Sequence, residues 1–335
     1  MPIQSQNVDR RLGRRSAVKL SVAMITYNHE CFIRQALESV LAQRVSFDYE
    51  IVVGEDCSTD GTRAILMDFH RRYPERIVPL LHDRNIGALR NSQATLAACR
   101  GQYLAIVEGD DYWTCEDKLR RQVDFLDHHP DYAICCHRAQ IRDETAGGRV
   151  DVVPSFAAGS YTIEDLIAFN FIPTCTVMYR WGSVGPLPDW FLDLKLGDWP
   201  LHILVARSGK IELMDEVMAV YRMHSGGMWT SGDAIDQKYA MMRMMKALDR
   251  HLSFQYANAI HRTYAVFYFD MAIIERLDGN RIATLRYLAA SLCRGLSLAG
   301  RWRALMSLFA YSVFGIRRPN RSASEPKLTK GQSHQ

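Results

Sequence analysis

The sequence lacks the cysteine spacing that would indicate a metal-binding or redox motif. Its eight cysteines are scattered along 335 residues, with no Cys-x-x-Cys pair and no histidine spacing of a zinc site. We therefore interpret most of them as small buried hydrophobic side chains in a reducing compartment.

Several catalytic motifs are also missing. The sequence contains no Gly-x-Ser-x-Gly, no Walker loop and no dinucleotide fingerprint. The segment after the first expected strand, Thr26 to Glu30, is not the Gly-rich, basic phosphate loop that nucleotidyltransferases usually carry. The net charge of +4 is too small to argue for nucleic acid, and no stacked basic-aromatic pattern is present, so we expect no nucleic-acid partner.

The N-terminal segment does not fit a signal peptide. Four arginines lie between residues 10 and 15, but the apolar stretch behind them is interrupted by Lys19 and soon reaches Asn28 and Glu30. We expect no cleaved leader, a loose basic arm over residues 1–17, and a cytoplasmic protein.

What is present is a regular alternation of strand and helix patterns. Mostly apolar runs at 20–25, 50–54, 77–81 and 103–107 predict strands, and the first is continuous enough in apolar character to be buried on both faces. Segments with apolar residues at helical spacing separate them. This alternation predicts an α/β fold, in which a mostly parallel sheet is flanked by helices and the ligand lies beyond the carboxyl ends of the strands.

Polar residues gather where these strands end. The four loops are expected to converge on one crevice, and they contain Thr26 to Asn28, Glu55 with Asp56, Asn85 to Gly87, and Asp110 with Asp111. The adjacent carboxylates Asp110 and Asp111 must be solvated, paired or metal-bound. Such ligands suit Mg²⁺ or Mn²⁺, and the alternative is an acidic turn that caps the following helix.

The ordered set of these segments resembles the family 2 glycosyltransferases of the GT-A fold. The resemblance covers roughly residues 18–230, and it depends on these stretches: Val22 to Asn28, Glu50 to Thr62, Asn85-Ile86-Gly87, and Glu108-Gly109-Asp110-Asp111-Tyr112-Trp113. At the second loop the family usually has two aspartates, and here the first acid is Glu55. The second acid contacts the base in relatives, so the departure matters little.

The resemblance implies a nucleotide pocket made by the first three loops. Thr26 and Asn28 would line it, with Tyr27 near the base. Asp56 would accept the N3–H of a uracil or thymine, which a cytosine lacks. Residues in the segment that approaches the nucleotide and donor sugar are Asn85, Arg90 and Asn91.

The resemblance also implies a metal site. Asp111 would bind Mn²⁺ or Mg²⁺, and Asp110 the ribose or the water shell of the metal. The segment Tyr221-Arg222-Met223-His224 matches the family's Tyr-Arg-x-His, so His224 would ligate the metal or touch the diphosphate, and Arg222 would neutralise phosphate charge. A satisfied structural histidine is the alternative for His224.

Asp198 is the expected catalytic base. In related transferases an acidic residue at this place opens the helix under the acceptor site. From the residues alone, Asp198 could simply cap that helix, with Pro200 tolerated in its first turn. The two roles are compatible, because a capping carboxylate can keep one oxygen free.

The C-terminal part has a different composition, typical of long helices. We expect an all-helical extension over 233–318 after a GT-A domain at 18–232, whose nucleotide-binding half is 18–113 and whose acceptor half is 114–232, and a disordered tail at 319–335. The uncharged run 304–316 is too short to span a bilayer and is flanked by arginines. Such a helix fits either the surface of an anionic membrane, as in a peripheral membrane protein, or a position packed on the catalytic domain or in an oligomer, with the arginines as a solvated face.

The expected function is that of an inverting, metal-dependent glycosyltransferase. It would move a sugar from a UDP-sugar, or less favourably a dTDP-sugar, to a hydroxyl of a carbohydrate, glycolipid or glycoprotein, in surface polysaccharide or glycoconjugate synthesis. The alternative is a nucleotide-sugar-binding assembly protein at the membrane that performs no turnover. Such a protein keeps the nucleotide pocket and does not need Asp198.

Overall fold

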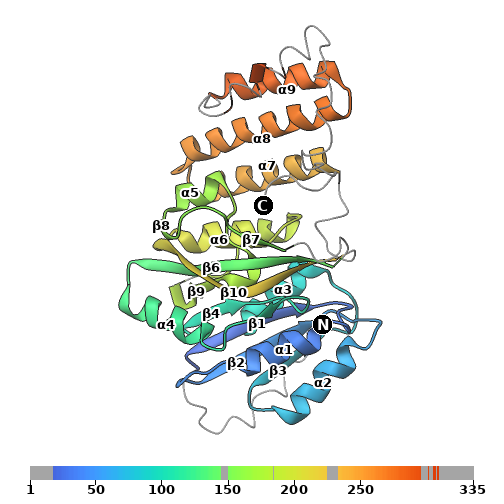
Figure 1. Cartoon of the computed structure of the whole chain (residues 1–335), viewed down its shortest axis with the longest axis vertical. Coiled ribbons are helices and arrows are strands. Elements are labelled where there is room, and N and C mark those ends of the chain that lie inside the picture. Colours follow the sequence, from blue (N-terminus) through green and yellow to red (C-terminus); the bar gives the residue numbers. More distant parts are fainter. Residues whose placement is uncertain are drawn as a thin grey trace, which may run out of the picture.

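The structure is a computed structural model that describes residues 18–144, 150–183, 185–224, 233–295, 301, 305–306 and 308. The expected arm at 1–17, the tail at 319–335 and most of the apolar run 304–316 lie outside the described residues. Figure 1 shows a sheet with helices on both faces and further helices stacked beyond one face.

Within the described residues, ten strands form one sheet. Their order is β3-β2-β1-β4-β9-β6-β10-β5, with β7 paired to β6 and β8 to β10. The strands are β1 (Leu20–Thr26), β2 (Tyr49–Glu55), β3 (Ile77–Leu81), β4 (Tyr103–Ile106), β5 (Tyr112–Trp113), β6 (Tyr132–Asp143), β7 (Val150–Val153), β8 (Gly159–Tyr161), β9 (Met178–Arg180) and β10 (Lys210–Met223).

The first four strands are all parallel, as the alternation of patterns predicts. Leu20 at the start of β1 lies opposite Tyr49 of β2 and Tyr103 of β4, so these strands start level and end at the same edge. The polar loops that follow them are therefore neighbours.

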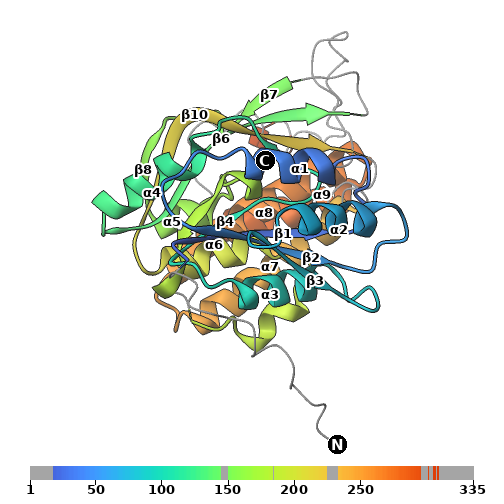
Figure 2. The ribbon, with the colours of Figure 1, turned by 90° about the horizontal axis from the view of Figure 1, so that it is seen from below.

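Successive side chains of these strands enter two different cores, because a strand points alternate residues to opposite faces. Val22 and Met24 pack in a cluster with residues of three helices, α1 (Ile33–Leu41), α2 (Thr62–Arg72) and α4 (Lys118–His128). Ala23 packs in the other cluster, with residues of α3 (Ala88–Ala98), α5 (Ile163–Ala168) and α6 (Asp198–Ala206). Figure 2 shows α1 and α2 on one side of β1 and β2, and α3 on the other.

The second half of the sheet is mixed. β9 is antiparallel to β4 and β6, whereas β6 and β10 form a long parallel pair that ends at Met223 opposite Asp143. β5 pairs antiparallel with β10, with Tyr112 opposite Val220. This pairing brings the segment after β4 beside the end of β10.

The segment 174–180 consists of a tight turn followed by a short strand. A 3₁₀ turn occupies Thr174–Thr176, and β9 begins at Met178. The backbone N–H and the hydroxyl of Thr176 both donate to the carbonyl of Pro173, which closes the turn.

Between residues 233 and 295, three helices follow the sheet: α7 (Ala234–His251), α8 (Ala257–Leu277) and α9 (Arg281–Cys293). The Asp233 side chain caps α7, and the Asn280 side chain caps α9. In Figure 1 they are stacked in sequence order away from the sheet, with α9 outermost. The predicted α/β class with a C-terminal helical extension is confirmed, while the exact domain boundaries stay predictions.

Within the described ranges, none of the helices combines the length and the apolar character needed to cross a bilayer.

Candidate active site

The turn between β4 and β5 carries the two adjacent aspartates. Its path depends on Gly109, because a Cβ there would lie 2.6 Å from Thr26 Oγ1 and 3.0 Å from His29 Nδ1. The Gly109 backbone N–H also donates to the carbonyl of Ile25. The turn is thus pressed against the loop after β1, which is the close approach that only glycine permits.

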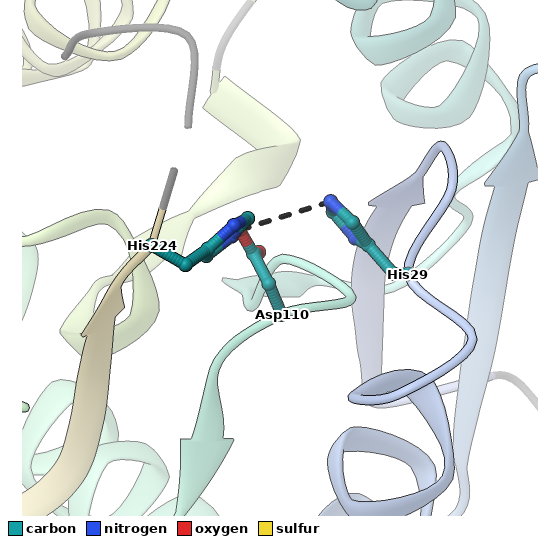
Figure 3. A group of neighbouring side chains, drawn as sticks. All are labelled: His29, Asp110 and His224. Atoms are coloured by element: carbon teal, nitrogen blue, oxygen red, sulfur yellow. Dashed lines mark hydrogen bonds and ion pairs between the residues drawn. The ribbon is translucent and has the colours of Figure 1, made fainter. Parts of the chain in front are cut away.

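Three side chains meet at this turn and form the His29–Asp110–His224 cluster (Figure 3). One ligand atom from each lies within 4.8 Å of the others. His224 Nε2 is 3.0 Å from Asp110 Oδ2, and His29 Nε2 is 3.8 Å from the same oxygen. The three residues come from the loop after β1, the turn after β4 and the end of β10.

The cluster fits a divalent metal ion. Asp110 Oδ1 is buried without a hydrogen-bond partner, so the site has polar capacity that protein atoms do not fill. Two imidazoles and one carboxylate form a mixed nitrogen and oxygen donor set. Among the described residues this is the group of three such side chains that could hold an ion.

The surroundings shift the pKa of all three cluster residues. Burial alone would raise the pKa of Asp110, but the hydrogen bond from His224 and the charge of His29 outweigh it, so the pKa lies below its ordinary value. The hydrogen bond to Asp110 raises the pKa of His224, and burial lowers the pKa of His29. Asp110 is therefore held as a carboxylate.

Asp111 lies outside the cluster, although the sequence predicted it as a metal ligand. It is 1% exposed, and its Oδ1 accepts the backbone N–H of Arg222 at 2.9 Å. Its Oδ2 is buried without a partner. Burial and the neighbouring carboxylates of Asp110 and Glu108 raise its pKa well above the ordinary value. The metal role of Asp111 stays a prediction, and Asp110 is the aspartate that the structure places beside His224.

Arg222 is part of the frame that holds this turn. Its guanidinium donates to the carbonyl of Asp110 and to Gln35 Oε1 of α1, and it lies 4.4 Å from the ring centre of Tyr112. Only 7% of the residue is exposed. The guanidinium of Arg222, which we expected to neutralise phosphate charge, thus donates hydrogen bonds to other groups of the protein.

The first two strand-end loops are tied to each other. Asn28, at φ 55°, accepts the backbone N–H of Thr59 at 2.8 Å on its Oδ1, and its own N–H donates to Ser58 Oγ at 3.0 Å. Thr26 is buried with an unpartnered hydroxyl, and Tyr27 is 41% exposed. Of the predicted pocket residues, Tyr27 is free to stack on a base, whereas Asn28 bonds the two loops together.

The third loop is held by Asp56. Its two carboxylate oxygens accept the backbone N–H groups of Ile86 at 2.7 Å and Gly87 at 2.9 Å. Asn85 is exposed, with its Oδ1 accepting from the Gly87 N–H, and Arg90 is exposed on the first turn of α3.

Asn91 is a structural residue of α3. Only 1% of it is exposed, and its amide donates to the carbonyl of Gly54 at 2.8 Å while its Oδ1 contacts His82 Nε2. These bonds fix α3 to the end of β2, so Asn91 does not face a ligand.

Asp198 is the first residue of α6, and its side chain does not cap that helix. The N-cap is Gly197, and no side-chain capping bond is present. Instead Asp198 Oδ2 accepts from Asn170 Nδ2 at 3.0 Å. One turn later His202 is fully buried and contacts the hydroxyl of Tyr179, and burial lowers its pKa to about 4. Asp198 is half-buried, and its second oxygen has no role in the helix end.

The carboxyl group of Glu108 interacts electrostatically with both Asp110 of the cluster and Asp198. Burial and the carboxylates of Asp110 and Asp198 raise its pKa to about 8. The expected base and the cluster are thus close enough for both to act on one side chain. Perturbed groups of this kind gather at functional sites.

Three residues of the site were not found from the sequence. His29 is adjacent to the first predicted pocket loop, and its spacing to any other ligand gave no signal. Glu108 precedes the predicted pair directly and could have been included with it. Asn170 gave no signal in the sequence, because its hydrogen-bond partner Asp198 is 28 residues away.

Known proteins are similar to this chain in sequence and in fold. A family model described as "Glycosyl transferase family 2" matches residues 21–191, about half of the chain. An uncharacterized protein of Mycobacterium tuberculosis is 38% identical over 221 residues, which are 66% of this chain and 63% of the relative. The chain therefore spans less than two thirds of the length of that relative.

Two solved structures share the fold. S. aureus TarS 1–349 in complex with UDP-GlcNAc has a TM-score of 0.61 at 18% identity, covering 89% of both chains. The mannosyltransferase PcManGT from Pyrobaculum calidifontis in complex with GDP-Man and Mn²⁺ has a TM-score of 0.54 at 15% identity, covering 87% of this chain and 80% of that one.

Proposed function

Because the chain belongs to glycosyl transferase family 2 and has its GT-A fold, we propose that it moves a sugar from a UDP-sugar to an acceptor hydroxyl, with inversion at the anomeric carbon. The observation that carries this proposal is the His29–Asp110–His224 cluster, which lies beyond the ends of the parallel strands in the same electrostatic neighbourhood as Asp198. The chain covers only 63% of the length of the mycobacterial relative. The substrates that we name for the whole protein are therefore part of what we propose.

The metal site would be formed by Asp110, His224 and His29. In place of Asp111, Asp110 is the ligand that we assign, because its carboxylate lies beside His224 and His29, whereas Asp111 lies outside this cluster. An ion bound there supplies positive charge to the departing diphosphate. Mg²⁺ strongly prefers oxygen ligands, whereas Mn²⁺ also accepts imidazole, so this donor set favours Mn²⁺. The mannosyltransferase with the same fold was solved with Mn²⁺.

The uracil of the donor would lie at Asp56. A carboxylate offers about four lone-pair positions, and two are used by Ile86 and Gly87. The remaining capacity suits the N3–H of uracil or of the thymine in a dTDP-sugar. The TarS structure that shares this fold contains UDP-GlcNAc, which supports UDP as the first choice.

Asp198 would act as the general base. Asn170 holds one of its oxygens at 3.0 Å, which leaves the other to accept the proton of the attacking hydroxyl. A single displacement with one base inverts the configuration. The acceptor class that we propose is a hydroxyl of a carbohydrate, glycolipid or glycoprotein.

Calorimetric titration of UDP with Mn²⁺ tests the donor site. We expect UDP to bind more tightly than CDP or GDP, and binding to be lost on chelation and in Asp110→Asn. Asp193→Asn is the matched control, because Asp193 is an exposed aspartate outside the cluster. If Asp111→Asn abolishes metal-dependent binding and Asp110→Asn does not, the ligand assignment is wrong.

Turnover is tested separately with UDP-sugars. Release of UDP by the wild type, and its loss in Asp198→Asn with UDP affinity retained, would support the transferase. Normal UDP binding by both proteins with no turnover of any UDP-sugar would favour the non-catalytic binding protein instead. The anomeric configuration of the product, read by NMR, tests the inversion.

A further inference from the structure

The outward side of α9 is apolar and exposed. Ile282 is 84% exposed, Leu285 42% and Leu292 46%. Together with the exposed Ala289 they recur at intervals of three and four residues, so they lie on one side of the helix. We call this set the outer face of α9. The opposite side, with Tyr287 and Leu288, is buried against α8.

Further exposed apolar side chains lie beyond both ends of α9 in the chain. Leu277, the last residue of α8, is 66% exposed, and Met306 is 62% exposed. Single exposed leucines are ordinary on a protein surface, but a row of them on one helix marks an interaction site. In Figure 1, α9 is the outermost of the labelled helices.

The charged residues of α9 and its C-cap all have one sign, and Arg281 and Arg286 are exposed whereas Arg294 packs over the ring of Tyr268 in α8. From Asn280 to Gly295 the sequence contains Arg281, Arg286 and Arg294, with no aspartate or glutamate. Arg286 is exposed and follows Ile282 by four residues, so it projects from the same side. The sequence after α9 continues this character, since the uncharged run 304–316 is followed by Arg317, Arg318 and Arg321.

We propose that the outer face of α9 docks on an anionic phospholipid surface, a property beyond the transfer reaction itself. A helix with apolar residues on one side and basic residues around them lies in the headgroup region, with its apolar side in the acyl boundary. Each arginine near an anionic leaflet strengthens the attachment. A second copy of the chain is a poorer occupant, because symmetric pairing of this face would bring arginines of the same sign together.

Co-sedimentation of the full chain with lipid vesicles tests the proposal. We expect binding to vesicles of phosphatidylcholine mixed with phosphatidylglycerol, and at least tenfold weaker binding to phosphatidylcholine alone. Binding to the mixed vesicles should weaken as salt is raised. Equal binding to both vesicle types, or none to either, would overturn the proposal.

Variants of the outer face localise the contact. Ile282→Glu should weaken binding to mixed vesicles by more than tenfold, because it places a like charge where an apolar side chain was buried. Arg286→Glu should weaken it by about fivefold or more, and Arg286→Lys should leave it nearly unchanged. Val152→Glu is the control, since Val152 is 44% exposed on β7 of the sheet.

Two measurements exclude trivial explanations. The melting temperature and the UDP affinity of each variant should equal those of the wild type, which shows that the fold is retained. Sedimentation velocity without lipid reports the oligomeric state. A wild-type dimer that Ile282→Glu converts to a monomer, with no vesicle binding by either, would assign the face to a second copy and overturn the membrane proposal.

Discussion

A hydrogen atom at Gly109 keeps the turn after β4 in contact with the loop that carries His29. In Gly109→Ala the new Cβ would meet Thr26 and His29 at 3.0 Å or less, so one of the two loops must move. We expect the affinity for Mn²⁺ to fall by about 10- to 100-fold, the effect typical of a displaced ligand support. Isothermal titration with Mn²⁺ and UDP measures it.

The matched control is Gly182→Ala, because a Cβ at Gly182 meets no atom within 4 Å. It should bind Mn²⁺ as the wild type does. Unchanged Mn²⁺ affinity in Gly109→Ala would show that His29 does not contribute to the metal site.

The amide of Asn170 positions one oxygen of Asp198. Asn170→Ala removes this donor and frees the carboxylate to rotate, so we expect kcat to fall by about 10- to 100-fold. The affinity for UDP and Mn²⁺ should stay the same, because Asn170 is not part of the cluster. Steady-state UDP release, together with calorimetry, separates the two effects. A rise in the Kd for UDP with kcat intact would assign Asn170 to the donor site.

At the scale of single elements, α4 begins with an unusual group. Lys118 is fully buried, with its ammonium 4.1 Å from the ring centre of Trp113 and 2.8 Å from Gln122 Oε1. The Gln122 amide in turn donates to the carbonyls of Cys135 and Thr176, so this pair fastens α4 to the sheet. Burial lowers the pKa of Lys118 to about 7.

This pKa predicts how stability depends on pH. Between pH about 7 and about 10 the unfolded chain keeps a proton on Lys118 that the folded chain has lost. The free energy of unfolding should therefore rise with pH across this window, by at most about 1.4 kcal/mol per pH unit from this group. Urea melts of the wild type and of Lys118→Met, compared at each pH, isolate the contribution. The difference between the two proteins would be constant if Lys118 stayed charged.

The elements themselves were largely predictable. The parallel strands β1, β2 and β4 are largely buried on both faces, so their sequences are mostly apolar runs that stand out without an alignment, and the partly buried edge strand β3 is also mostly apolar. β10 was not predicted as a strand, because its register shifts at Met214, Val217 and Ala219 interrupt the alternation of apolar and polar residues. The two-residue β5 is too short to have a pattern of its own.

The sequence predicted which loops come together, but not how each of their side chains is placed. Parallel strands that end at one edge bring their loops together, which is a property of the topology. Which of two adjacent aspartates faces the ligand depends on the turn between β4 and β5, and the local sequence does not determine this. The same limit applies to Asn28 and Asn91, whose amides bond neighbouring backbone.

For the whole molecule, bound metal should act as a cross-link. The three cluster residues come from positions 29, 110 and 224, so an ion joins segments that are far apart in the chain. We expect Mn²⁺ at about 100 times its Kd to raise the free energy of unfolding by about 2.7 kcal/mol. Differential scanning calorimetry with Mn²⁺ and with chelator measures this, and Asp110→Asn should abolish the difference. An equal gain in Asp110→Asn would place the ion elsewhere.

The strand order also affects how the chain can fold while it is being synthesised. β4 pairs with β1 on one side and with β9 on the other, and β9 is made about 70 residues later. A nascent chain that has formed β1 to β4 on the ribosome therefore presents the open edge of an apolar strand until β9 emerges. Open edges of this kind invite pairing with other chains. Translation pauses between residues 107 and 177 should accordingly increase the demand for chaperones and the aggregated fraction during expression.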